Sequence, residues 1–365
     1  MSTYFTGKSI LITGSSGTVG SELVKQLLGM GKFSPKYIIG IDNNESELFF
    51  QDQGYLDDQR VQFFVVDVRD QLSLSQKMAG VDIVFHCAAL KHVILCERSP
   101  EQAVQTNIIG VQNVITAAQQ NMVEKVIFTS SDKAVNPTNV MGTSKLMGER
   151  LMTAANSNKR IRQPIFASTR FGNVLGSNGS VVPIFHNQIA KGGPITLTDK
   201  KMTRFIMSIE DSVKLVIDSA VQARGGEVFI TKMPVVRIED LAIAMINEIA
   251  PIYGFKPEEI ALTQIGVKPG EKIYEELMSS EETRRAIELE SYFSVLPAFR
   301  GIYYDIDYDY NDILSKTVTN PYISEQVEPL NVNQIREFLR EFNLLDAPNE
   351  LTSLRYWPGD KEEKS

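Results

Sequence analysis

The stretch ILITGSSGTVGSEL, residues 10–23, restricts the fold of this chain more than any other part of the sequence. An apolar run of strand-forming residues comes first, a glycine-rich turn follows, and the apolar spacing of a helix begins after it. Gly14 suits a tight turn, Gly17 lets a bound pyrophosphate approach the backbone, and Gly20 allows the helix to pack closely on the sheet. The N–H groups at the start of such a helix bind phosphate. The stretch therefore predicts a dinucleotide site, whose expected contacts are Gly14, Ser16, Gly17, Thr18, Val19 and Gly20.

Further apolar runs repeat this alternation of strand and helix through the first half of the chain. Helical spacing marks residues 20–31 and 101–120. The expected strands are SILIT, YIIGID, VQFFVVDV, DIVFHCAA, KVIFTS and PIFAST. Strands that are apolar throughout and separated by helices indicate a parallel sheet covered on both faces. We therefore predict an α/β fold with a doubly wound parallel sheet.

The chain is long for one such domain. At 365 residues, a large domain with a satellite, or two domains, is expected. The periodic pattern loosens after the sixth strand into a segment rich in Gly, Asn and Thr, which suggests a smaller α/β lobe. We predict a nucleotide-binding domain over 1–175, to which 205–232 return, and a lobe made of 176–204 and 233–300. The C-terminal extension 301–365 is interpreted as extra packing or as an oligomer contact.

Two carboxylates are expected where the adenosine half of a dinucleotide lies. Asp42 ends the second strand roughly 20 residues beyond the glycine turn and can bind the ribose hydroxyls, and Asn43 follows it. The charge of Asp42 would repel a 2′-phosphate, and DNNESE offers no Arg or Lys to attract one, so NAD is expected rather than NADP. Asp67 and Val68 close the third strand beside the adenine, although Asp67 is equally interpreted as a helix or turn cap.

Charge and composition argue against several other classes of protein. A formal net charge of -8 opposes binding to a nucleic-acid backbone. The two cysteines, Cys87 and Cys96, are expected to be reduced thiols, and the three histidines form no ligand-spaced set, so no metal site is predicted. The N-terminus has no signal-peptide pattern, and no segment offers the ~20 continuous apolar residues of a membrane span. We therefore expect a soluble, cytoplasmic protein.

Several motifs resemble those of one enzyme family. In chain order, TGSSGTVG, HCAALKHV, TNIIG, SSDKAVNPTNVMGTSK and RFGNVLGS resemble the extended short-chain dehydrogenases/reductases, which have a Rossmann fold. With MTRF and KPGEK added, the chain is more closely similar to the UDP-N-acetylglucosamine 4,6-dehydratases of bacterial polysaccharide and nonulosonic acid biosynthesis. The resemblance extends from about Lys8 to Ser280. Its most specific part is the Asp-Lys pair followed by NPTNVMG.

The resemblance implies a reaction that recycles its cofactor. Enzymes of this kind oxidise the sugar C4 hydroxyl with tightly bound NAD, which makes the C5 hydrogen acidic; water then leaves from C6, and the hydride returns to C6. Most members of the wider family use a Tyr four residues before the motif Lys, but this chain has Met141 four residues before Lys145. Some dehydratases are similar in having Met there. Base chemistry would then fall to other residues.

The resemblance also implies roles for a short segment. Asp132 and Lys133 are expected as the general acid at C6 and the base at C5, acting as a coupled pair. The C4 proton would go to either of them, directly or through water, with Ser131 or Thr143 as a relay. Lys145 would bind the nicotinamide ribose. The alternatives are a turn carboxylate for Asp132 and a solvated side chain for Lys145.

The remaining site residues are predicted only from the resemblance to the family. Lys91 would reach the cofactor or the sugar, and Asn107 would lie on the central helix behind the site, although Lys91 and His92 could be plain surface residues. Arg204 and Lys268 would pair with a diphosphate, and Glu271 would accept from a ribose or uracil donor. The complete additional set is Ala88, Ala89, Lys91 and Asn107 for the cofactor, and Lys91, Ser131, Met141, Asn173, Arg204, Lys268 and Glu271 for the substrate.

Two other functions are consistent with the same motifs. A nucleotide-sugar epimerase or reductase would share the fold, although a 4-epimerase would normally need the missing Tyr. A catalytically silent NAD-sensing protein would explain Met141 as a lesion, but it would not explain Asp132, Lys133 and Lys145. The leading expectation is a homo-oligomeric dehydratase acting on UDP-N-acetylglucosamine, with a GDP-sugar and the C5 stereochemistry left open.

Overall fold

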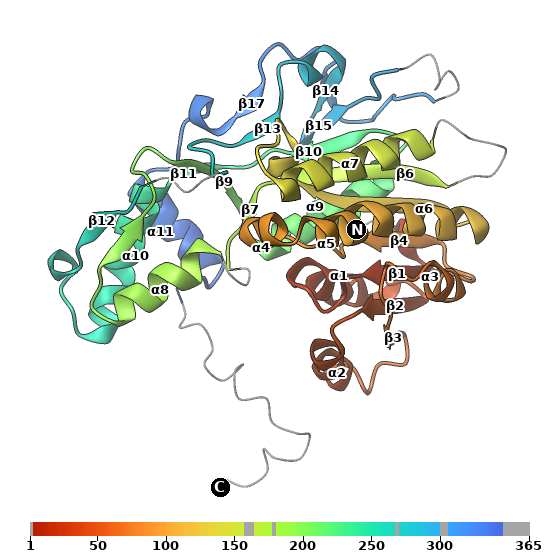
Figure 1. Cartoon of the computed structure of the whole chain (residues 1–365), viewed down its shortest axis with the longest axis horizontal. Helices are drawn as coiled ribbons and strands as arrows, with labels where there is room; N and C mark the ends of the chain where they lie inside the picture. The colour runs from red at the N-terminus through yellow and green to blue at the C-terminus, as the bar shows by residue number, and fades with distance from the viewer. Residues whose placement is uncertain (1–2, 157–163, 177–179, 267–269, 300–305, 346–365) are drawn as a thin grey trace, which may run out of the picture.

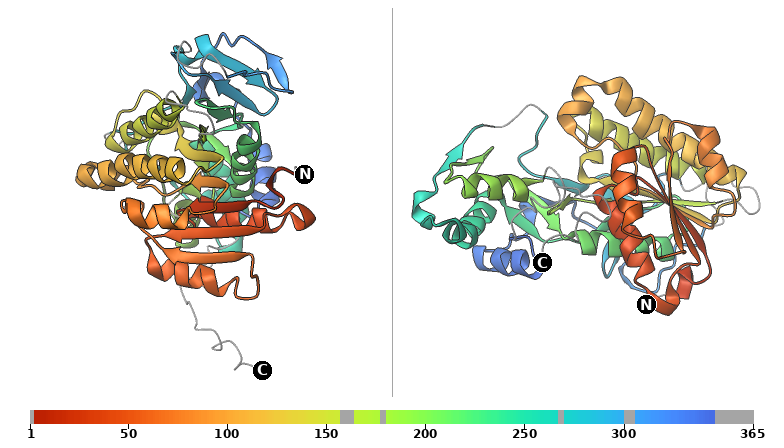
Figure 2. Two further views of the ribbon diagram at one scale, coloured as in Figure 1. Left: turned by 90° about the vertical axis from the view of Figure 1, so that its right-hand side faces the viewer. Right: turned by 90° about the horizontal axis from the view of Figure 1, so that it is seen from below.

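The computed structural model describes residues 3–156, 164–176, 180–266, 270–299 and 306–345 (Figure 1). A large sheet with helices on both faces forms the main domain, and a smaller lobe lies beside it (Figures 1 and 2). Two predictions fall outside the described residues: the diphosphate contact of Lys268 and the last part of the C-terminal extension.

Seven parallel strands form most of a ten-stranded sheet. Their order is β10-β6-β5-β4-β1-β2-β3, so the chain proceeds in one direction from β1 to β3 and in the other from β4 to β10. The direction reverses between β1 and β4, where connections that diverge leave a crevice for a ligand. The predicted doubly wound α/β fold is confirmed. The strands are β1 (Ser9–Thr13), β2 (Tyr37–Asp42), β3 (Val61–Val65), β4 (Ile83–His86), β5 (Lys125–Ser131), β6 (Ile165–Phe171) and β10 (Val228–Thr231).

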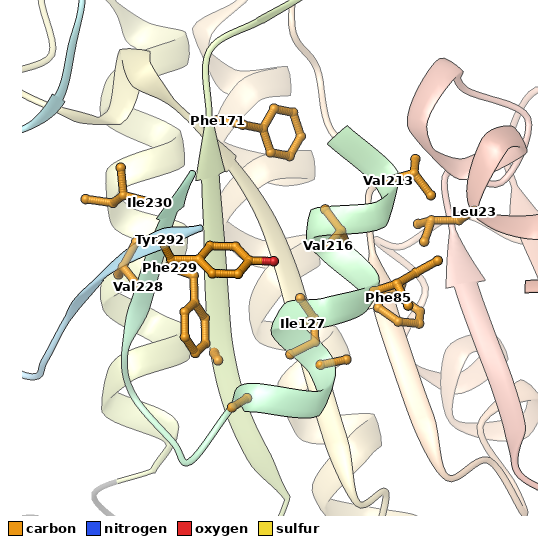
Figure 3. Close-up of a cluster of buried hydrophobic side chains, with 14 of the residues drawn as sticks. Leu23, Phe85, Ile127, Phe171, Val213, Val216, Val228, Phe229, Ile230 and Tyr292 are labelled. Atoms are coloured by element: carbon orange, nitrogen blue, oxygen red, sulfur yellow. The ribbon is translucent and has the colours of Figure 1, made fainter. Parts of the chain in front are cut away.

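Each face of the sheet packs on its own helices. In β1, Ile12 belongs to a core shared with α1 and α9, whereas Leu11 belongs to a second core shared with α3, α6 and α7. Figure 3 shows the first core, where Leu23, Phe85 and Val213 gather from three separate elements. Continuous apolar strands therefore serve two cores, as expected for a buried parallel sheet. The helices are α1 (Thr18–Leu28), α3 (Gln71–Lys77), α6 (Gly110–Gln120), α7 (Val140–Ala155) and α9 (Ile209–Gln222).

Three antiparallel strands extend the sheet beyond β10. β15 pairs with β10, β14 with β15, and β16 with β14. We assigned 233–300 to the smaller lobe, and the pairing corrects that assignment for β14 and β15. A short turn joins them as a hairpin, which needs no crossover helix, and Leu289 and Tyr292 enter the main core. The strands are β14 (Ala286–Leu289), β15 (Tyr292–Val295) and β16 (Ile313–Ser315).

The smaller lobe has a core of its own, in which α10 packs against α8 and α11 and a sheet of β8 and β12 joins them. A third sheet has the order β11-β9-β7, and the chain returns to the main domain only after β9. The elements are α8 (Val181–Ala190), α10 (Ile238–Ile249), α11 (Val332–Glu341), β7 (Asn173–Val174), β8 (Ile195–Leu197), β9 (Thr203–Met207), β11 (Val235–Arg237) and β12 (Leu262–Gln264).

Helix α11 gives part of the C-terminal extension a place in this lobe. Asn331 and Gln334 exchange hydrogen bonds in a capping box at its start. Ile335 and Leu339, one turn apart, are fully buried in the core of the lobe. Packing within the chain is therefore one role of the extension. The division into lobes otherwise stays a prediction.

A buried ion cluster connects β6, α7 and the segment after β13 (Glu276–Met278). Arg170 is 1% exposed, and each of its five N–H groups has an acceptor. The guanidinium donates to Glu149 at 2.6 and 3.0 Å, to Glu282 at 3.1 and 3.2 Å, and to the Leu277 carbonyl at 2.7 Å. Burial opposes ionisation of Glu282, but the Arg170 charge lowers its pKa to about 2. Glu149 also accepts from the Ser130 hydroxyl at 2.6 Å, which connects the cluster to β5.

Removal of the Arg170 guanidinium should destabilise the fold strongly. Arg170→Met leaves two buried carboxylates without their cation, and breaking such a pair costs about 3–5 kcal/mol. The free energy of unfolding from urea titration measures the loss. Arg340→Met is the matched control, because Arg340 is 59% exposed in its ion pair with Glu248 and should cost less than about 1 kcal/mol. Equal losses in the two variants would contradict the prediction.

Candidate active site

The glycine-rich turn has the close contacts that a dinucleotide site needs. Gly14 has a φ of 68°, and a Cβ atom there would lie 2.7 Å from the Ala88 nitrogen. A Cβ atom at Gly20 would lie 2.1 Å from the Gly14 carbonyl oxygen, so only glycine allows α1 to approach the turn this closely. Gly17 precedes α1 and makes no side-chain cap. Backbone N–H groups, rather than a side chain, therefore face the position of a phosphate. Ser16 lies in the same turn, and Thr18 and Val19 are the first two residues of α1.

The carboxylate of Asp42 lies beside this turn at the end of β2. Its two oxygens accept from the Ser16 N–H at 3.2 Å and the Asn44 N–H at 3.0 Å. Asp67 accepts from the Arg69 N–H and side chain at 2.5–3.0 Å, and from the Asn43 side chain at 3.4 Å. The turn interpretation of Asp67 is therefore correct, and its place beside an adenine stays a prediction. Val68 is buried against α6, where it packs close to Gly110.

The loop after β4 is held by side chains from both sides. The Cys87 and Ala88 N–H groups each donate to the Thr13 hydroxyl at 3.2 Å. Asn107 accepts from the Leu90 N–H at 2.8 Å and donates to the Leu90 carbonyl at 2.9 Å. Asn107 lies in a π-helical turn (Val104–Ile109) behind the loop, as predicted for the central helix. The loop that carries Ala88, Ala89 and Lys91 thus starts at the point where the strand order reverses.

Lys145 and Met141 occupy the buried first turns of α7. The Lys145 ammonium donates to the Thr129 carbonyl at 3.0 Å and lies 4.7 Å from the centre of the Phe128 ring. Burial lowers its pKa to about 8. The interpretation of Lys145 as a solvated side chain is therefore wrong. Met141 packs with Cys96 and other apolar side chains, and it is not among the residues that line the two cavities described below. The structure thus gives Met141 a packing role, and its substrate contact stays a prediction.

Asp132 and Lys133 follow β5 directly and form a pair at the edge of the sheet. The Lys133 ammonium lies 2.9 and 3.1 Å from the two Asp132 oxygens, and the Ser131 hydroxyl donates to Asp132 at 2.6 Å. Burial opposes both charges, but each charge stabilises the other, so the pKa of Asp132 is lowered and that of Lys133 is raised. The pair therefore rests as carboxylate and ammonium, the reverse of the neutral acid and base that the predicted roles require.

Glu275 is a third member of this cluster that the sequence analysis did not identify. Its carboxylate lies 3.8 Å from the Lys133 ammonium and 3.2 Å from Arg204 Nε. The Asn173 amide donates to both of its oxygens at 2.9 Å, and the Phe205 N–H donates to one at 3.1 Å. Burial, and then the Asp132 charge, raise the pKa of Glu275 to about 7. Glu275 is therefore the carboxyl group of the site that can gain or lose a proton near neutral pH.

This cluster opens into a cavity of about 620 Å³ between the sheet edge and the smaller lobe. Asp132, Lys133 and Glu275 line one side, and a short helix, α4 (Val93–Arg98), supplies an apolar wall next to His92. A second cavity of about 310 Å³ extends into the lobe. The residues that line both cavities are Asn173, Arg204 and Glu271. The volumes are in the range of small-molecule sites, and the two cavities are contiguous at these side chains.

Two predicted substrate residues have additional structural contacts. Arg204 donates to the carbonyls of Thr203, Lys272 and Ile273 at 2.8–3.1 Å, so its guanidinium holds the loop that ends at Glu275. Its predicted role as a diphosphate partner stays a prediction. One carboxylate oxygen of Glu271 is buried without a hydrogen-bond partner in the described part of the chain. Glu271 therefore retains an acceptor for a ligand donor.

Comparison with known protein families shows which family the chain belongs to. The model of the polysaccharide biosynthesis protein family matches residues 10–297, most of the chain. The chain belongs to this family. Among curated relatives, the UDP-N-acetylglucosamine 4,6-dehydratase (inverting) of Campylobacter jejuni is 39% identical over 86% of this chain and 90% of its own length. The predicted resemblance to 4,6-dehydratases among the extended short-chain dehydrogenases/reductases is thereby confirmed.

Other relatives in the family have different names. A UDP-glucose 4-epimerase of Rickettsia canadensis is 37% identical over 93% of this chain and 97% of its own length. A protein of Methanocaldococcus jannaschii, described as an uncharacterised membrane protein, is 48% identical over 94% of this chain and 99% of its own length. In the described ranges of the present chain, no helix has the length and apolar character needed to cross a membrane. The relatives therefore support a nucleotide-sugar enzyme without deciding its reaction.

Solved structures share the fold. The X-ray structure of Pen from Bacillus thuringiensis superposes with a TM-score of 0.86 at 38% identity and covers 94% of this chain and 100% of its own. The dTDP-glucose 4,6-dehydratase DesIV of Streptomyces venezuelae, solved with NAD, gives a TM-score of 0.63 at 21% identity and covers 73% of this chain and 86% of its own. This second likeness supports a Rossmann fold for the present chain.

The raised pKa of Glu275 predicts a pH-dependent contribution to stability. The folded pKa of about 7 exceeds the ordinary 4.5, so this contribution is complete below about pH 4.5 and is lost as the pH rises through 7. Glu275→Gln removes the titration. Relative to wild type, the free energy of unfolding of the variant should therefore rise between about pH 5 and pH 8, by up to about 3 kcal/mol.

Urea titrations at the two pH values measure this change. Glu290→Gln is the control for the loss of a glutamate carboxylate, because Glu290 is exposed and lies outside the cluster. A difference between wild type and Glu275→Gln that does not vary with pH would contradict the raised pKa.

Proposed function

We propose that this chain is a nucleotide-sugar 4,6-dehydratase that converts UDP-N-acetylglucosamine to a UDP-4-keto-6-deoxy-N-acetylhexosamine, for a bacterial surface glycan or a nonulosonic acid. The observation that carries the proposal is the cluster at the wall of the larger cavity, in which Lys133 lies between the buried carboxyl groups of Asp132 and Glu275. Loss of water across C5 and C6 needs a base and an acid on adjacent carbons. A lysine between two carboxyl groups supplies such groups within one hydrogen-bonded unit.

The cofactor we propose is NAD, tightly bound and recycled within each turnover. The glycine turn, Asp42 and the loop at Ala88 fit a dinucleotide, because their backbones approach closely and Asp42 is held at the turn by backbone N–H groups. NAD held there would supply the hydride acceptor for C4 oxidation and the hydride donor for C6. Asp42 would repel a 2′-phosphate, and the nearby Arg69 is already paired with Asp67, which supports NAD over NADP.

Proton transfer within the Asp132–Lys133 pair would generate the predicted catalytic forms. The pair rests charged, but transfer of one proton across the 2.9 Å contact gives a neutral carboxylic acid and a neutral amine. Substrate that displaces water from the cavity would favour the neutral forms, since burial penalises charge. Lys133 can then remove the C5 proton, and Asp132 can protonate the departing C6 hydroxyl.

Glu275 would set the proton count of the cluster. When Glu275 is protonated, only Asp132 competes for the Lys133 charge, and the amine is released more easily. When Glu275 is ionised, two carboxylates hold the ammonium at 2.9 and 3.8 Å. We therefore expect turnover to fall as the pH rises through the Glu275 pKa of about 7.

The C4 hydroxyl proton has a plausible acceptor route through Ser131. Its hydroxyl already donates to Asp132 at 2.6 Å, so a proton taken by Ser131 can pass to the carboxylate. In this route the C4 proton makes Asp132 the neutral acid, and the Lys133 proton leaves to water in the cavity instead of to Asp132. The Thr143 hydroxyl instead donates to the Asn139 carbonyl within α7 at 3.0 Å. Of the two predicted relays, the geometry favours Ser131.

A 4-epimerase is the second candidate, supported by the 37% identity to the Rickettsia canadensis protein. Incubation with UDP-N-acetylglucosamine in deuterated water, without added cofactor, distinguishes the two by NMR. A dehydratase should give a 4-keto-6-deoxy sugar with deuterium at C5, whereas an epimerase should give the C4 epimer without deuterium. The same spectrum gives the C5 configuration. Failure to form the 4-keto product, with cofactor demonstrably bound, would refute the proposed reaction.

Replacement of the proposed base should abolish turnover. In Lys133→Ala, kcat should fall by at least about 10²–10⁴-fold, because the variant loses the amine that lies between the Asp132 and Glu275 carboxyl groups. Steady-state formation of the 4-keto product measures kcat. Lys200→Ala is the control, since Lys200 is half exposed in an ion pair with Glu239 on the smaller lobe. Near wild-type turnover in Lys133→Ala would remove Lys133 from the mechanism.

A further inference from the structure

The C-terminal extension reaches the active site through one buried serine. β17 (Tyr322–Ile323) pairs antiparallel with β13, and Ser324 follows it, fully buried. The Ser324 N–H donates to the Glu275 carbonyl at 2.9 Å, and the Ser324 hydroxyl accepts from the Glu275 N–H at 2.9 Å. The extension thus binds both backbone polar groups of the residue whose carboxylate faces Lys133.

The same hydroxyl also binds β9. Ser324 Oγ lies 2.7 Å from the Thr203 hydroxyl and 3.4 Å from the Thr203 carbonyl. All contacts are satisfied when Ser324 accepts from the Glu275 N–H and the Thr203 hydroxyl and donates to the Thr203 carbonyl. The next residue, Arg204, contacts the Glu275 carboxylate at 3.2 Å. One hydroxyl therefore joins the backbone of Glu275 to the strand that supplies its arginine partner.

The groups that surround the Glu275 carboxylate all come from other elements. Asp132 and Lys133 follow β5, Asn173 belongs to β7, and Arg204 belongs to β9. The position of the carboxylate among them consequently depends on how the backbone before β13 is docked. Side chains at active sites need such support, because a displacement of about 1 Å can cost roughly 10²-fold in rate.

We propose that Ser324 is a positioning residue for the Glu275 carboxyl group. The C-terminal extension thereby contributes to the geometry of the active site. The proposal rests on the proposed function, in which Glu275 sets the proton count of the cluster. Ser324 acts through Glu275, because its own hydroxyl is occupied by the backbone of Glu275 and by Thr203.

Ser324→Ala tests this role. Loss of the hydroxyl leaves the Glu275 N–H without its acceptor, so β13 should shift away from β9. We expect kcat to fall about tenfold, with KM changed less than about twofold. The limb of the pH profile near 7 should also move to lower pH, since Glu275 would lie farther from Asp132 and in more water. Ser315→Ala is the matched control on the same extension, where the hydroxyl donates to the Thr317 carbonyl and accepts from the Thr317 N–H.

An unchanged kcat and pH profile in Ser324→Ala would overturn the proposal. A lower stability of the variant, with the fall of turnover still centred near pH 7, would overturn it as well. If Ser324→Ala does not fold, Ser324→Cys decides in the same way, because sulfur is a weak acceptor. The pH dependence of unfolding between about pH 5 and pH 8 reports the Glu275 titration without any substrate. Positioning by Ser324 is therefore tested even if the wild-type protein forms no 4-keto product, an outcome that would refute only the proposed reaction.

Discussion

The Lys133 ammonium lies between two buried carboxyl groups, and the arrangement of the site depends on that contact. Asp132 and Glu275 would repel each other if both were ionised without a cation nearby, and burial adds to that cost. The Lys133 charge, at 2.9 and 3.8 Å, lowers the cost of both, and Arg204 is a second cation 3.2 Å from Glu275. Lys133 lowers the pKa of Asp132, whereas burial and the Asp132 charge raise the pKa of Glu275 to about 7. The two carboxyl groups are thus divided into one that is ionised and one that titrates near neutral pH.

The two segments that supply this cluster are joined a second time, deeper in the protein. Ser130, two residues before Asp132, donates to Glu149, which pairs with Arg170. Arg170 in turn donates to the carbonyl of Leu277, two residues beyond Glu275. The polar contact at the cavity and the ion cluster beneath it therefore connect the same two stretches of chain. A shift of β13 relative to β5 would strain both.

Local patterns were sufficient to predict the main domain, and contacts between distant segments explain what was missed. The runs SILIT and YIIGID coincide with β1 and β2 because apolar runs between turns have few alternatives. Asp132 and Lys133 were predicted because the Asp-Lys pair and the NPTNVMG that follows it resemble a family motif. Glu275, in contrast, lies in a loop rich in charges just before β13, and only the folded chain brings it within 3.8 Å of Lys133, which is 142 residues earlier in the sequence. Its neighbours in sequence carry no periodic signal, and Met141 similarly gave no sign that it packs against Cys96.

Lys133 and Lys145 have different surroundings, which shows how the site differs from one that has a tyrosine at position 141. Lys133 has two carboxyl partners and a raised pKa, so it keeps its proton at rest. Lys145 is buried against a carbonyl and an aromatic ring, and its pKa falls to about 8. A lysine in such surroundings would lower the pKa of a phenol placed beside it, but Met141 offers no group to titrate. Lys145 is then left with hydrogen bonding as its contribution. The proposed mechanism therefore assigns proton exchange to Lys133, whose ammonium lies 2.9 Å from the Asp132 carboxylate.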